Sequence, residues 1–537
     1  MLLVRNIRLP LSCPDPDAEA AAQALHILRV PAHKAARCGV AKLSVDARHG
    51  KPVLVYTMAI TLKDEGEESA YAGASPCVCF TQPARFSFSV GDTALKTRPV
   101  VVGLGPAGLF AALLLARSGF RPLVLERGPE LDERVKAVEH FEKTGELNLN
   151  ANIQFGEGGA GTFSDGKLTT RVGDPLCAFV TDAFLQHGAP ADIAWRQKPH
   201  VGTDLLRGII RSIRQEIIAL GGEVRFNTAL TGLKIENGAL ASVETTAGDF
   251  ACEQLILAVG HSARDTFAML HQAGVPMEQK PFAVGVRIEH PRALIDRSQY
   301  GRFAGHPALG AADYKLSCRP LGGRGVYTFC MCPGGVVMAA ASEEGGLVVN
   351  GMSEHARDAV NSNSALLVGV GPEDFGSAHP LAGAAFQRKI EQAAFALGGG
   401  GYRAPIQLVA DFLRDQKSAS LGEVEPSYRP GVTFADLRDC LPAPVALSLK
   451  AALPAFGRQL AGFDRPDAVL TGVESRSSSP VRLLRDDSGQ SAVHGLFPCG
   501  EGAGYAGGIV SAAVDGVRAA EQVMRSLLGG ELPNPCG

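Results

Sequence analysis

The clearest pattern of apolar and polar positions lies between Val100 and Glu126. Val100 to Val102 is a short run of β-branched residues, which is typical of a buried parallel strand. Leu109 to Ala116 is apolar over the length of a short helix, and Leu123 to Leu125 is a second apolar run that ends at Glu126. The pattern therefore predicts a strand, a helix and a second buried strand, in that order.

Three glycines, Gly103, Gly105 and Gly108, separate the first predicted strand from the helix. We expect Gly103 to permit a tight turn, Gly105 to let the backbone approach a pyrophosphate, and Gly108 to let the helix pack closely on the strand. The free N–H groups and the dipole of the helix N-terminus favour an anion there. Glu126 can accept hydrogen bonds from the hydroxyls of an adenosine ribose. The unit therefore predicts a dinucleotide site.

Residues 1–95 show a separate pattern that predicts an N-terminal module. Leu2 to Leu9 alternates as a strand and is followed by a helix. Val40 to Ala47 and Pro52 to Leu62 read as two strands joined by a hairpin turn. This gives a β-α-β-β module of ferredoxin-like type, to which Arg85 to Val90 adds a further strand.

Three more segments of the chain are typical of a cofactor site, as the Val100–Glu126 unit is. Ile153 to Lys167 is a glycine-rich loop with small hydroxyl side chains, which suits close approach to a cofactor. Leu255 to Gly260 is another buried strand that ends in glycine. Gly500 to Gly508 is glycine-rich and leads into a helix from Ile509 to about Leu528. A helix N-terminus at that place would stabilise negative charge on a reduced flavin ring.

The order of these blocks divides the chain into three domains. The predicted sheet begins at Val100 and closes only when the C-terminal block returns to it, so residues 281–484 form an insertion. We therefore predict an N-terminal module at 1–95, a discontinuous cofactor-binding domain at 96–280 plus 485–530, and an inserted substrate or cap domain at 281–484.

Composition narrows the choice of partners and compartment. The net charge of −3 provides no basic field for nucleic acid, which argues against a nucleic-acid partner. The uncharged run from Pro99 to Ala116 is broken by three glycines and Pro106, so we expect no membrane span. Twelve cysteines scattered through a chain of 537 residues without a secretory segment indicate the cytoplasm. The oligomeric state is left open.

Together, the glycine motif with Glu126, the strand ending at Gly260, and Gly500–Glu501 before a long helix resemble the FAD fold of glutathione-reductase type. More narrowly, the chain resembles a bacterial, largely uncharacterised family called FAD-dependent dehydrogenases. This second resemblance is carried by Gly156–Lys167, Gly260–Thr266, Tyr327–Gly335 and Ser475–Arg482. In the superfamily an Asp usually stands where this chain has Glu501.

The resemblance implies an α/β fold with a Rossmann-like FAD/NAD(P)-binding domain, an inserted α+β substrate domain and an N-terminal ferredoxin-like α+β module. It implies FAD as the cofactor. The residues expected to bind it are Gly103, Gly105, Pro106, Ala107, Gly108, Glu126, Arg127, Gly158, Thr162, Ser164, Gly166, Gly260, His261, Gly500, Glu501, Gly507, Gly508 and Ile509.

Four residues are candidates for the chemistry: His200, Lys167, Cys330 and Arg476. His200 and His261 are candidate proton carriers, although a structural histidine is the competing interpretation for each. Arg476 and Arg482 lie in a serine-rich turn, which suggests an anion clamp; a solvated loop is the alternative.

Cys330 and Cys332 stand two residues apart in a predicted strand, so their thiols should face the same side. A redox or substrate-facing thiol competes there with packed core cysteines. Cys77 and Cys79 would have to complete a four-thiolate zinc site, but the spacing is not that of a zinc site, and we predict no metal.

These observations favour an FAD-dependent oxidoreductase of dehydrogenase type that transfers hydride at the flavin and acts on a small organic molecule. NAD(P)H is a candidate transient electron donor, because Gly369 and Gly371 begin only an incomplete second glycine motif. Two alternatives stay open. One is a flavin-dependent RNA-modifying protein, for which Arg207, Arg211 and Arg214 offer one charged helix face. The other is a non-catalytic FAD-binding protein.

Overall fold

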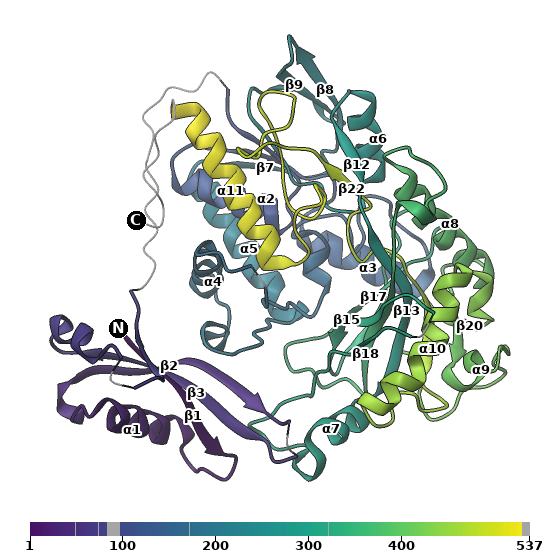
Figure 1. The fold of residues 1–537 in the computed structure, drawn as a ribbon. Coiled ribbons are helices and arrows are strands. Elements are labelled where there is room, and N and C mark those ends of the chain that lie inside the picture. Colours follow the sequence, from purple (N-terminus) through teal and green to yellow (C-terminus); the bar gives the residue numbers. More distant parts are fainter. Residues whose placement is uncertain (49, 74, 83–96, 171, 321, 529–537) are drawn as a thin grey trace.

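Three main sheets, each with its own hydrophobic core, form a mixed α/β structure (Figure 1). The computed structural model describes residues 1–48, 50–73, 75–82, 97–170, 172–320 and 322–528. The predicted strand from Arg85 to Val90 lies outside these residues.

The first sheet belongs to the N-terminal module and has the strand order β2-β3-β1-β4, with all neighbours antiparallel. Its elements are β1 (Leu2–Pro10), α1 (Pro16–Leu28), β2 (Ala35–Asp46), β3 (Val53–Leu62) and β4 (Val78–Phe80), with short 3₁₀ helices at Ala32–Lys34 and Glu65–Tyr71. Every second residue of β3 is buried, because only one face of the sheet packs against α1. The Asp15 side chain caps α1 by accepting from the Ala18 N–H at 3.0 Å.

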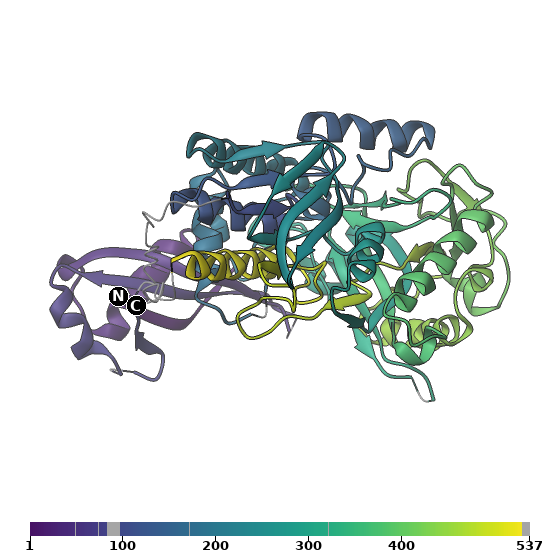
Figure 2. The same ribbon diagram turned by 90° about the horizontal axis from the view of Figure 1, so that it is seen from above.

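The N-terminal module projects to one side of the molecule (Figures 1 and 2). Its edge strand β2 meets the rest of the chain through Leu43, whose N–H donates to the Trp195 carbonyl at 2.7 Å. The Gln197 N–H in turn donates to the Leu43 carbonyl at 2.9 Å. The edge of the module is therefore paired with backbone of the second part of the chain at this point.

The second sheet is parallel, in the order β23-β11-β5-β6-β7. Its strands are β5 (Val100–Val102), β6 (Leu123–Leu125), β7 (Glu223–Arg225), β11 (Leu255–Leu257) and β23 (Leu496–Pro498). Both faces are covered: Val101 packs in the core beneath the helices, whereas Val100 and Val102 pack in the core on the opposite face. Burial on both faces explains the uninterrupted apolar runs of these strands.

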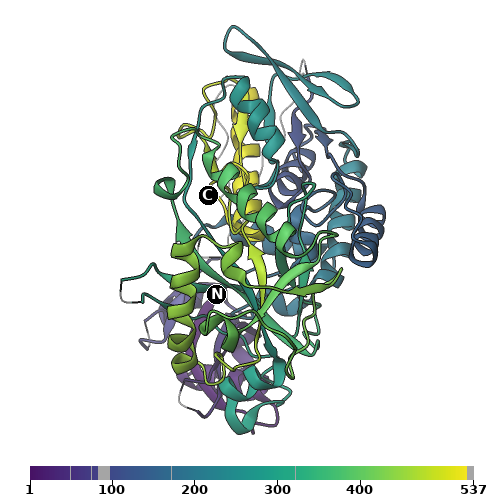
Figure 3. The same cartoon turned by 90° about the vertical axis from the view of Figure 1, so that its right-hand side faces the viewer.

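The elements that cover the parallel sheet are α2 (Pro106–Arg117), α4 (Leu176–Gln186), α5 (Thr203–Ala219), α6 (Arg264–Gln272), α11 (Ile509–Leu528) and a small sheet of β8 (Leu230–Glu236), β9 (Ala239–Thr245) and β10 (Gly248–Ala251). Helix α3 (Leu131–Thr144) packs elsewhere, where its Val138 shares a small core with Ile153, Phe163 and Met338. The β8–β9 hairpin projects at the top of Figures 1 and 3. Helices α2 and α11 pack closely, because a Cβ on Gly516 would lie only 2.0 Å from the Ala107 carbonyl oxygen.

The third sheet has seven strands in the order β14-β15-β18-β13-β21-β19-β20. These are β13 (Phe282–Pro291), β14 (Ser317–Cys318), β15 (Val326–Cys332), β18 (Asn361–Val370), β19 (Ala404–Leu408), β20 (Val432–Phe434) and β21 (Val469–Glu474). The helices of this part are α7 (Arg292–Tyr300), α8 (Ala382–Leu397), α9 (Val409–Leu413) and α10 (Ala443–Gln459), and a separate pair is formed by β16 (Val336–Ala339) and β17 (Val349–Met352). Residues of α7, α8, α9 and α10 share one core with β13 and β18.

The segments that enter and leave the seven-stranded part lie side by side. Just before it stands β12 (Met277–Gln279), and just after it β22 (Val481–Leu483), and these two short strands pair antiparallel. The three-part division expected from the sequence, with boundaries at 95, 280 and 484, stays a prediction.

Candidate functional site

A cavity of about 360 Å³ opens at the carboxyl ends of four neighbouring strands of the parallel sheet. The residues that follow β5, β6, β11 and β23 all contribute to its wall: Gly103, Glu126, Ala258 and Cys499. Helices α2 and α11 begin at the same wall, with Pro106 and Ile509 as their first residues. Two helix N-termini thus direct their free N–H groups toward one cavity, which favours a bound anion.

Four glycines of this wall leave open space where a side chain would stand, and only at Gly260 does a positive φ, of 75°, also favour glycine. A Cβ on Gly105 would meet only the Cα of Gly159, at 3.7 Å, and a Cβ on Gly260 or Gly507 would meet no atom within 4 Å. A Cβ on Gly508 would meet only the Ser511 hydroxyl, at 3.9 Å. Because all four line the cavity, an added side chain would occupy space that a ligand could fill.

Other glycines of the predicted site shape the backbone instead. Gly103 has a φ of 96°, and its Cβ would lie 2.3 Å from the Ala258 carbonyl oxygen. A Cβ on Gly108 would lie 1.8 Å from the Gly103 carbonyl oxygen, so helix and strand could not pack as they do. Gly158 and Gly166 adopt positive φ in the loop behind the wall. The cavity wall includes Gly103 but none of the other three.

Thr162 and Ser164 come from the glycine-rich loop and end in different places. Thr162 is fully buried, donates to the Glu157 carbonyl at 3.1 Å and is not part of the wall, so the expectation that its hydroxyl reaches the site does not fit the structure. Ser164 does line the cavity, while its hydroxyl donates to the Gly161 carbonyl at 2.7 Å.

Glu126 holds the turns around the cavity together. Its Oε2 accepts from the Leu104 N–H at 2.8 Å, and its Oε1 accepts from the N–H groups of Gly128 at 3.0 Å and Gly156 at 3.1 Å. A carboxylate has about four acceptor positions, so one remains for a ligand hydroxyl. Its neighbour Arg127 also lines the cavity, pairs with Asp265 and stacks over Phe155.

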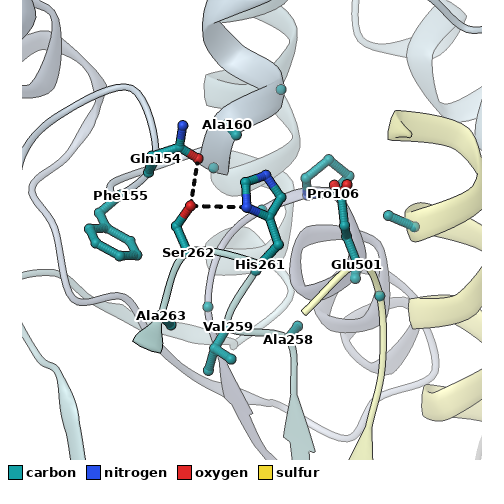
Figure 4. Close-up of a pocket in the computed structure, with 18 of the residues that line it drawn as sticks. Pro106, Gln154, Phe155, Ala160, Ala258, Val259, His261, Ser262, Ala263 and Glu501 are labelled. Carbon is teal, nitrogen blue, oxygen red and sulfur yellow. Dashed lines mark hydrogen bonds between the residues drawn. The ribbon is translucent and has the colours of Figure 1, made fainter. Parts of the chain in front are cut away.

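A chain of hydrogen bonds sets the protonation of His261 (Figure 4). The Gln154 amide nitrogen donates to the Ala340 carbonyl at 3.4 Å, which turns its oxygen toward Ser262. The Ser262 hydroxyl donates to that oxygen at 3.1 Å and has no second hydrogen to give, so His261 Nδ1, 2.9 Å away, is the donor to Ser262. Nε2 is then left as an acceptor.

The environment of His261 keeps its ring neutral. Burial, followed by the charges of Arg476 and Arg264, lowers its pKa to about 3. The ring belongs to the cavity wall, close to Pro106 and Glu501 (Figure 4). His261 thus offers the cavity a neutral imidazole rather than a cation.

Glu501 lies on the same wall, and its carboxylate accepts no hydrogen bond from the described residues. Burial raises its pKa to about 7, against the opposing charge of Lys280. Lys280 is itself tied to the Ser478 hydroxyl at 2.9 Å. A carboxyl group with free acceptor positions and a pKa near neutrality therefore faces the cavity.

The seven-stranded part closes the cavity from the other side with Phe329, Cys330, Asn350, Glu474, Arg476 and Ser477. Glu474 accepts from Arg287 at 2.7 Å, and burial raises the pKa of Glu474 to about 7 although Arg287 acts against it. Lys167, from the glycine-rich loop, donates to the Met331 carbonyl and lies 3.3 Å from Asp165. Burial opposes the charge of Lys167, but Cys332, Asp165 and Cys330 outweigh it and raise its pKa above 10.5.

Arg476 is buried rather than part of a solvated loop, so that alternative for this residue is wrong. Its Nε and Nη2 donate to the two oxygens of Glu391 at 3.0 and 2.9 Å, and Nη1 donates to Ser342. Arg264 binds the same carboxylate through Nη2 at 2.7 Å and Nη1 at 2.9 Å. Glu391 thus joins the first residue of α6 to the segment after β21.

Two predicted residues lie away from the cavity. His200 is not part of its wall; the ring stacks on His355, and burial lowers its pKa to about 4, which does not fit a proton carrier at this site. Arg482 is half exposed, lies beside Glu278 and stacks over the Tyr505 ring, so it does not clamp an anion in the cavity.

Five residues that support or line the site were not predicted from the sequence: Gln154, Ser262, Arg287, Glu391 and Glu474. Ser262 lies in the segment Gly260–Thr266, and its position next to the predicted site residue His261 was the signal that could have identified it. Arg287 and Glu474 stand within apolar strands, where a charged residue signals a buried pair.

The described residues contain no group of three or more metal-ligating side chains placed to hold an ion. Among the same residues, no helix combines the length and the apolar character that crossing a membrane requires.

Comparison with known proteins finds a family model and a relative that covers most of the chain. Residues 281–477 match the family model described as "FAD-dependent protein, C-terminal domain-like". The chain belongs to the same family as an uncharacterized protein of Clostridium beijerinckii, with which it is 56% identical over 440 residues, or 82% of this chain and 83% of that protein.

Two solved structures show a distant likeness. Glycine oxidase from Bacillus cereus is 10% identical, with a TM-score of 0.32, over 82% of this chain and 99% of that one. L-proline dehydrogenase from P. horikoshii is 13% identical, with a TM-score of 0.32, over 80% of this chain and 94% of that one. At these values the likeness gives no information on the substrate, and the glutathione-reductase type stays a prediction.

Proposed function

We propose that the chain is an FAD-dependent oxidoreductase that binds FAD in the cavity and acts on a small organic molecule between the parallel sheet and the seven-stranded sheet. The observation that carries the proposal is the wall at the strand ends, where two helix N-termini and four glycines without a steric partner meet. The family description of residues 281–477 supports FAD in particular.

The residues of the wall fit the parts of this cofactor. Gly105 and the start of α2 suit a pyrophosphate, because N–H groups and open space coincide there. The fourth acceptor position of Glu126 suits a ribose hydroxyl. Gly507, Gly508 and the start of α11 suit a ring that becomes negative on reduction. When bound, FAD supplies two-electron hydride chemistry.

Three side chains suit proton handling at this site. Glu501 and Glu474 line the cavity with pKa values of about 7, so each can hold or release a proton near neutral pH. His261 offers its Nε2 as an acceptor and stays neutral. A substrate O–H or N–H placed against these groups would be oriented for oxidation while the surrounding side chains exclude water.

NAD(P)H is proposed only as a transient donor at the same cavity, with ping-pong kinetics, because Gly369 lies at the end of β18 and opens no helix. The cytoplasmic location indicated by the cysteines stays a prediction.

The test begins with the purified protein. We expect a yellow protein whose chromophore, released by heat, is FAD and not FMN. Anaerobic mixing with a panel of amino acids, hydroxy acids and NAD(P)H should then bleach the flavin absorbance with at least one of them. A protein that binds no flavin when FAD is added would refute the cofactor, and a bound flavin that no donor reduces would favour the non-catalytic alternative.

A further inference from the structure

Two cysteines on the substrate side of the cavity have a geometry that a plain core strand does not need. Cys330 and Cys332 close β15, where the register with β18 shifts between Phe329 and Cys332. In a regular strand their Cα atoms would stand about 6.5–7 Å apart, at the upper limit for a disulfide. Cys330 instead has a φ of 41°, in the left-handed region that only a few per cent of non-glycine residues adopt.

This bulge brings the Cys332 side chain against the backbone of Cys330. The Cys332 thiol lies 3.3 Å from the Cys330 carbonyl oxygen. Both cysteines are free. A bulge that turns one side chain toward another is a recurrent device at functional sites in sheets.

Two cations converge on the same three residues. The fully buried Arg287 donates from Nη2 to the Cys330 carbonyl at 2.5 Å and lies 3.7 Å from Cys332 Sγ. Lys167 donates to the carbonyl of Met331, the residue between the cysteines. Positive charge beside a thiol favours the thiolate, which is the reactive form.

The carboxylates nearby are already paired with these cations. Glu474 lies 2.7 Å from Arg287, and Asp165 lies 3.3 Å from Lys167. The contact with Cys332 lowers the pKa of Cys330 well below 9.0, an effect that burial opposes and the two cations assist. The same contact and burial raise the pKa of Cys332, so the pair favours one thiolate and one thiol.

Access differs between the two sulfurs. Cys330 belongs to the cavity wall, and its neighbour Phe329 is 39% exposed at the same wall. Cys332 is fully buried behind it. One sulfur can therefore be reached by a molecule in the cavity, while the second can be reached only through the first.

We propose that Cys330 and Cys332 are a redox-active pair that exchanges with a small organic disulfide entering the cavity. Cys330 is the attacking cysteine and Cys332 the resolving cysteine. The inference rests on the proposed function, since it names a substrate class for that oxidoreductase.

The exchange balances without further reagents. The Cys330 thiolate attacks one sulfur of R–S–S–R, which forms a mixed disulfide with Cys330 and releases RS⁻. The Cys332 thiol gives its proton to RS⁻, and its sulfur attacks Cys330 Sγ, which forms the Cys330–Cys332 disulfide and releases a second RS⁻. The pair has then lost two electrons and one proton. The return to thiolate and thiol takes up two electrons and one proton, the amount that a reduced flavin carries.

The chain contains a matched control with the same spacing. Cys77 and Cys79 flank Val78 at β4 in the N-terminal module, and Cys77 has the Ser75 hydroxyl, 3.0 Å away, as its neighbour. Neither residue has a positive φ. Chemistry that came only from two cysteines separated by one residue would occur at both pairs.

The experiment equilibrates the purified full-length protein with glutathione and glutathione disulfide at a series of ratios, traps free thiols with iodoacetamide, and maps the peptides by mass spectrometry. We expect a Cys330–Cys332 disulfide to form while Cys77 and Cys79 remain separate thiols. At about pH 6, iodoacetamide should modify Cys330 at least about tenfold faster than Cys79, because its thiolate fraction is larger.

Two variants identify the order of attack. Cys332→Ser should retain glutathione on Cys330 as a stable mixed disulfide, and Cys330→Ser should retain none on Cys332. The wild-type mapping needs no variant to fold. An unreactive Cys330 in the wild type, or a rate no higher than that of Cys79, would overturn the inference.

Flavin absorbance is recorded on the same samples. A pair that exchanges in protein unable to bind FAD would sustain the thiol chemistry and refute the proposed function. FAD-bound protein in which Cys330 does not react would refute the thiol pair alone.

Discussion

The substitution Glu391→Gln tests whether one buried carboxylate holds α6, beside the parallel sheet, to the segment after β21 of the seven-stranded sheet. Glu391 is fully buried in α8 and accepts four hydrogen bonds from Arg264 and Arg476, and a fifth from the Ser475 hydroxyl at 2.6 Å. A glutamine would keep one acceptor oxygen but point an NH₂ group at guanidinium donors. The buried guanidinium groups of Arg264 and Arg476 would then lose the negative charge that Glu391 supplies.

The magnitude follows from this arrangement. Breaking a buried ion pair costs about 3–5 kcal/mol. Glu343 lies 2.7 Å from Arg264 and offsets part of the loss, so we expect the lower end of that range. About 3 kcal/mol corresponds to a fall in Tm of about 6–12 °C for a unit of 150–250 residues.

The assay is thermal unfolding followed by far-UV circular dichroism. Glu343→Gln is the matched control: its side chain is 25% exposed, so the change should cost about 1 kcal/mol or less. The Arg264 and Arg476 charges hold the pKa of Glu391 well below 4.5 against burial. The ionised Glu391 carboxylate therefore stabilises the folded protein at every pH above the pKa that it has in the unfolded chain. The Tm difference between wild type and Glu391→Gln should stay constant from about pH 8 to 5 and narrow only below about 4.5. A Tm for Glu391→Gln equal to that of Glu343→Gln would refute the reasoning.

Three further outcomes are expected. Gly108→Ala should lower Tm markedly, because its Cβ would lie 1.8 Å from the Gly103 carbonyl oxygen. The matched variant Gly208→Ala in α5, with no atom within 4 Å of the Cβ, should raise stability by up to about 1 kcal/mol. Equal Tm values for the two variants would contradict this. Ser262→Ala should weaken FAD binding by about 0.5–1.5 kcal/mol in a titration of apoprotein, because His261 Nδ1 loses the hydroxyl that accepts its hydrogen bond. An unchanged Kd would show that the hydrogen bonds from Gln154 through Ser262 to His261 do not contribute to FAD binding. In Glu501→Gln, we expect the Tm to rise relative to the Tm of wild type as the pH goes from about 5 to 8. The Glu501 carboxyl has a pKa of about 7 in the folded protein and near 4.5 in the unfolded chain, so wild type loses stability over this pH range and the glutamine variant does not. A Tm difference that stays constant with pH would argue against the burial of the Glu501 carboxyl.

The elements around the dinucleotide motif could be predicted closely from sequence. The predicted runs at Val100–Val102, Leu123–Leu125 and Ile509–Leu528 coincide with β5, β6 and α11. Burial on both faces gives such strands uninterrupted apolar runs, and a helix with one buried face keeps a regular period. The strand expected from Leu255 to Gly260 is shorter, Leu255–Leu257, because Ala258 and Val259 after it are also apolar and apolarity alone does not mark where pairing ends.

The side of the cavity formed by the seven-stranded sheet could not be predicted in the same way. Arg287, Cys330 and Glu474 come from three strands that pair through β18 and β21, and their meeting depends on sheet order rather than on spacing. The bulge at Cys330 leaves no mark in composition. Arg476 was noticed from a serine-rich turn, but its partner Glu391 lies in a distant helix, so its burial could not be inferred.

The most direct test of the account compares Gly105→Val with Gly369→Val. A side chain at either position meets almost no protein atom, but Gly105 lines the cavity and Gly369 lies at the exposed end of β18. The measurement is flavin absorbance per chain after saturation with FAD, with circular dichroism as the check on folding. The account predicts a folded Gly105→Val protein that has lost its flavin and a Gly369→Val protein that retains it. A Gly105→Val protein with the flavin content of wild type would contradict it.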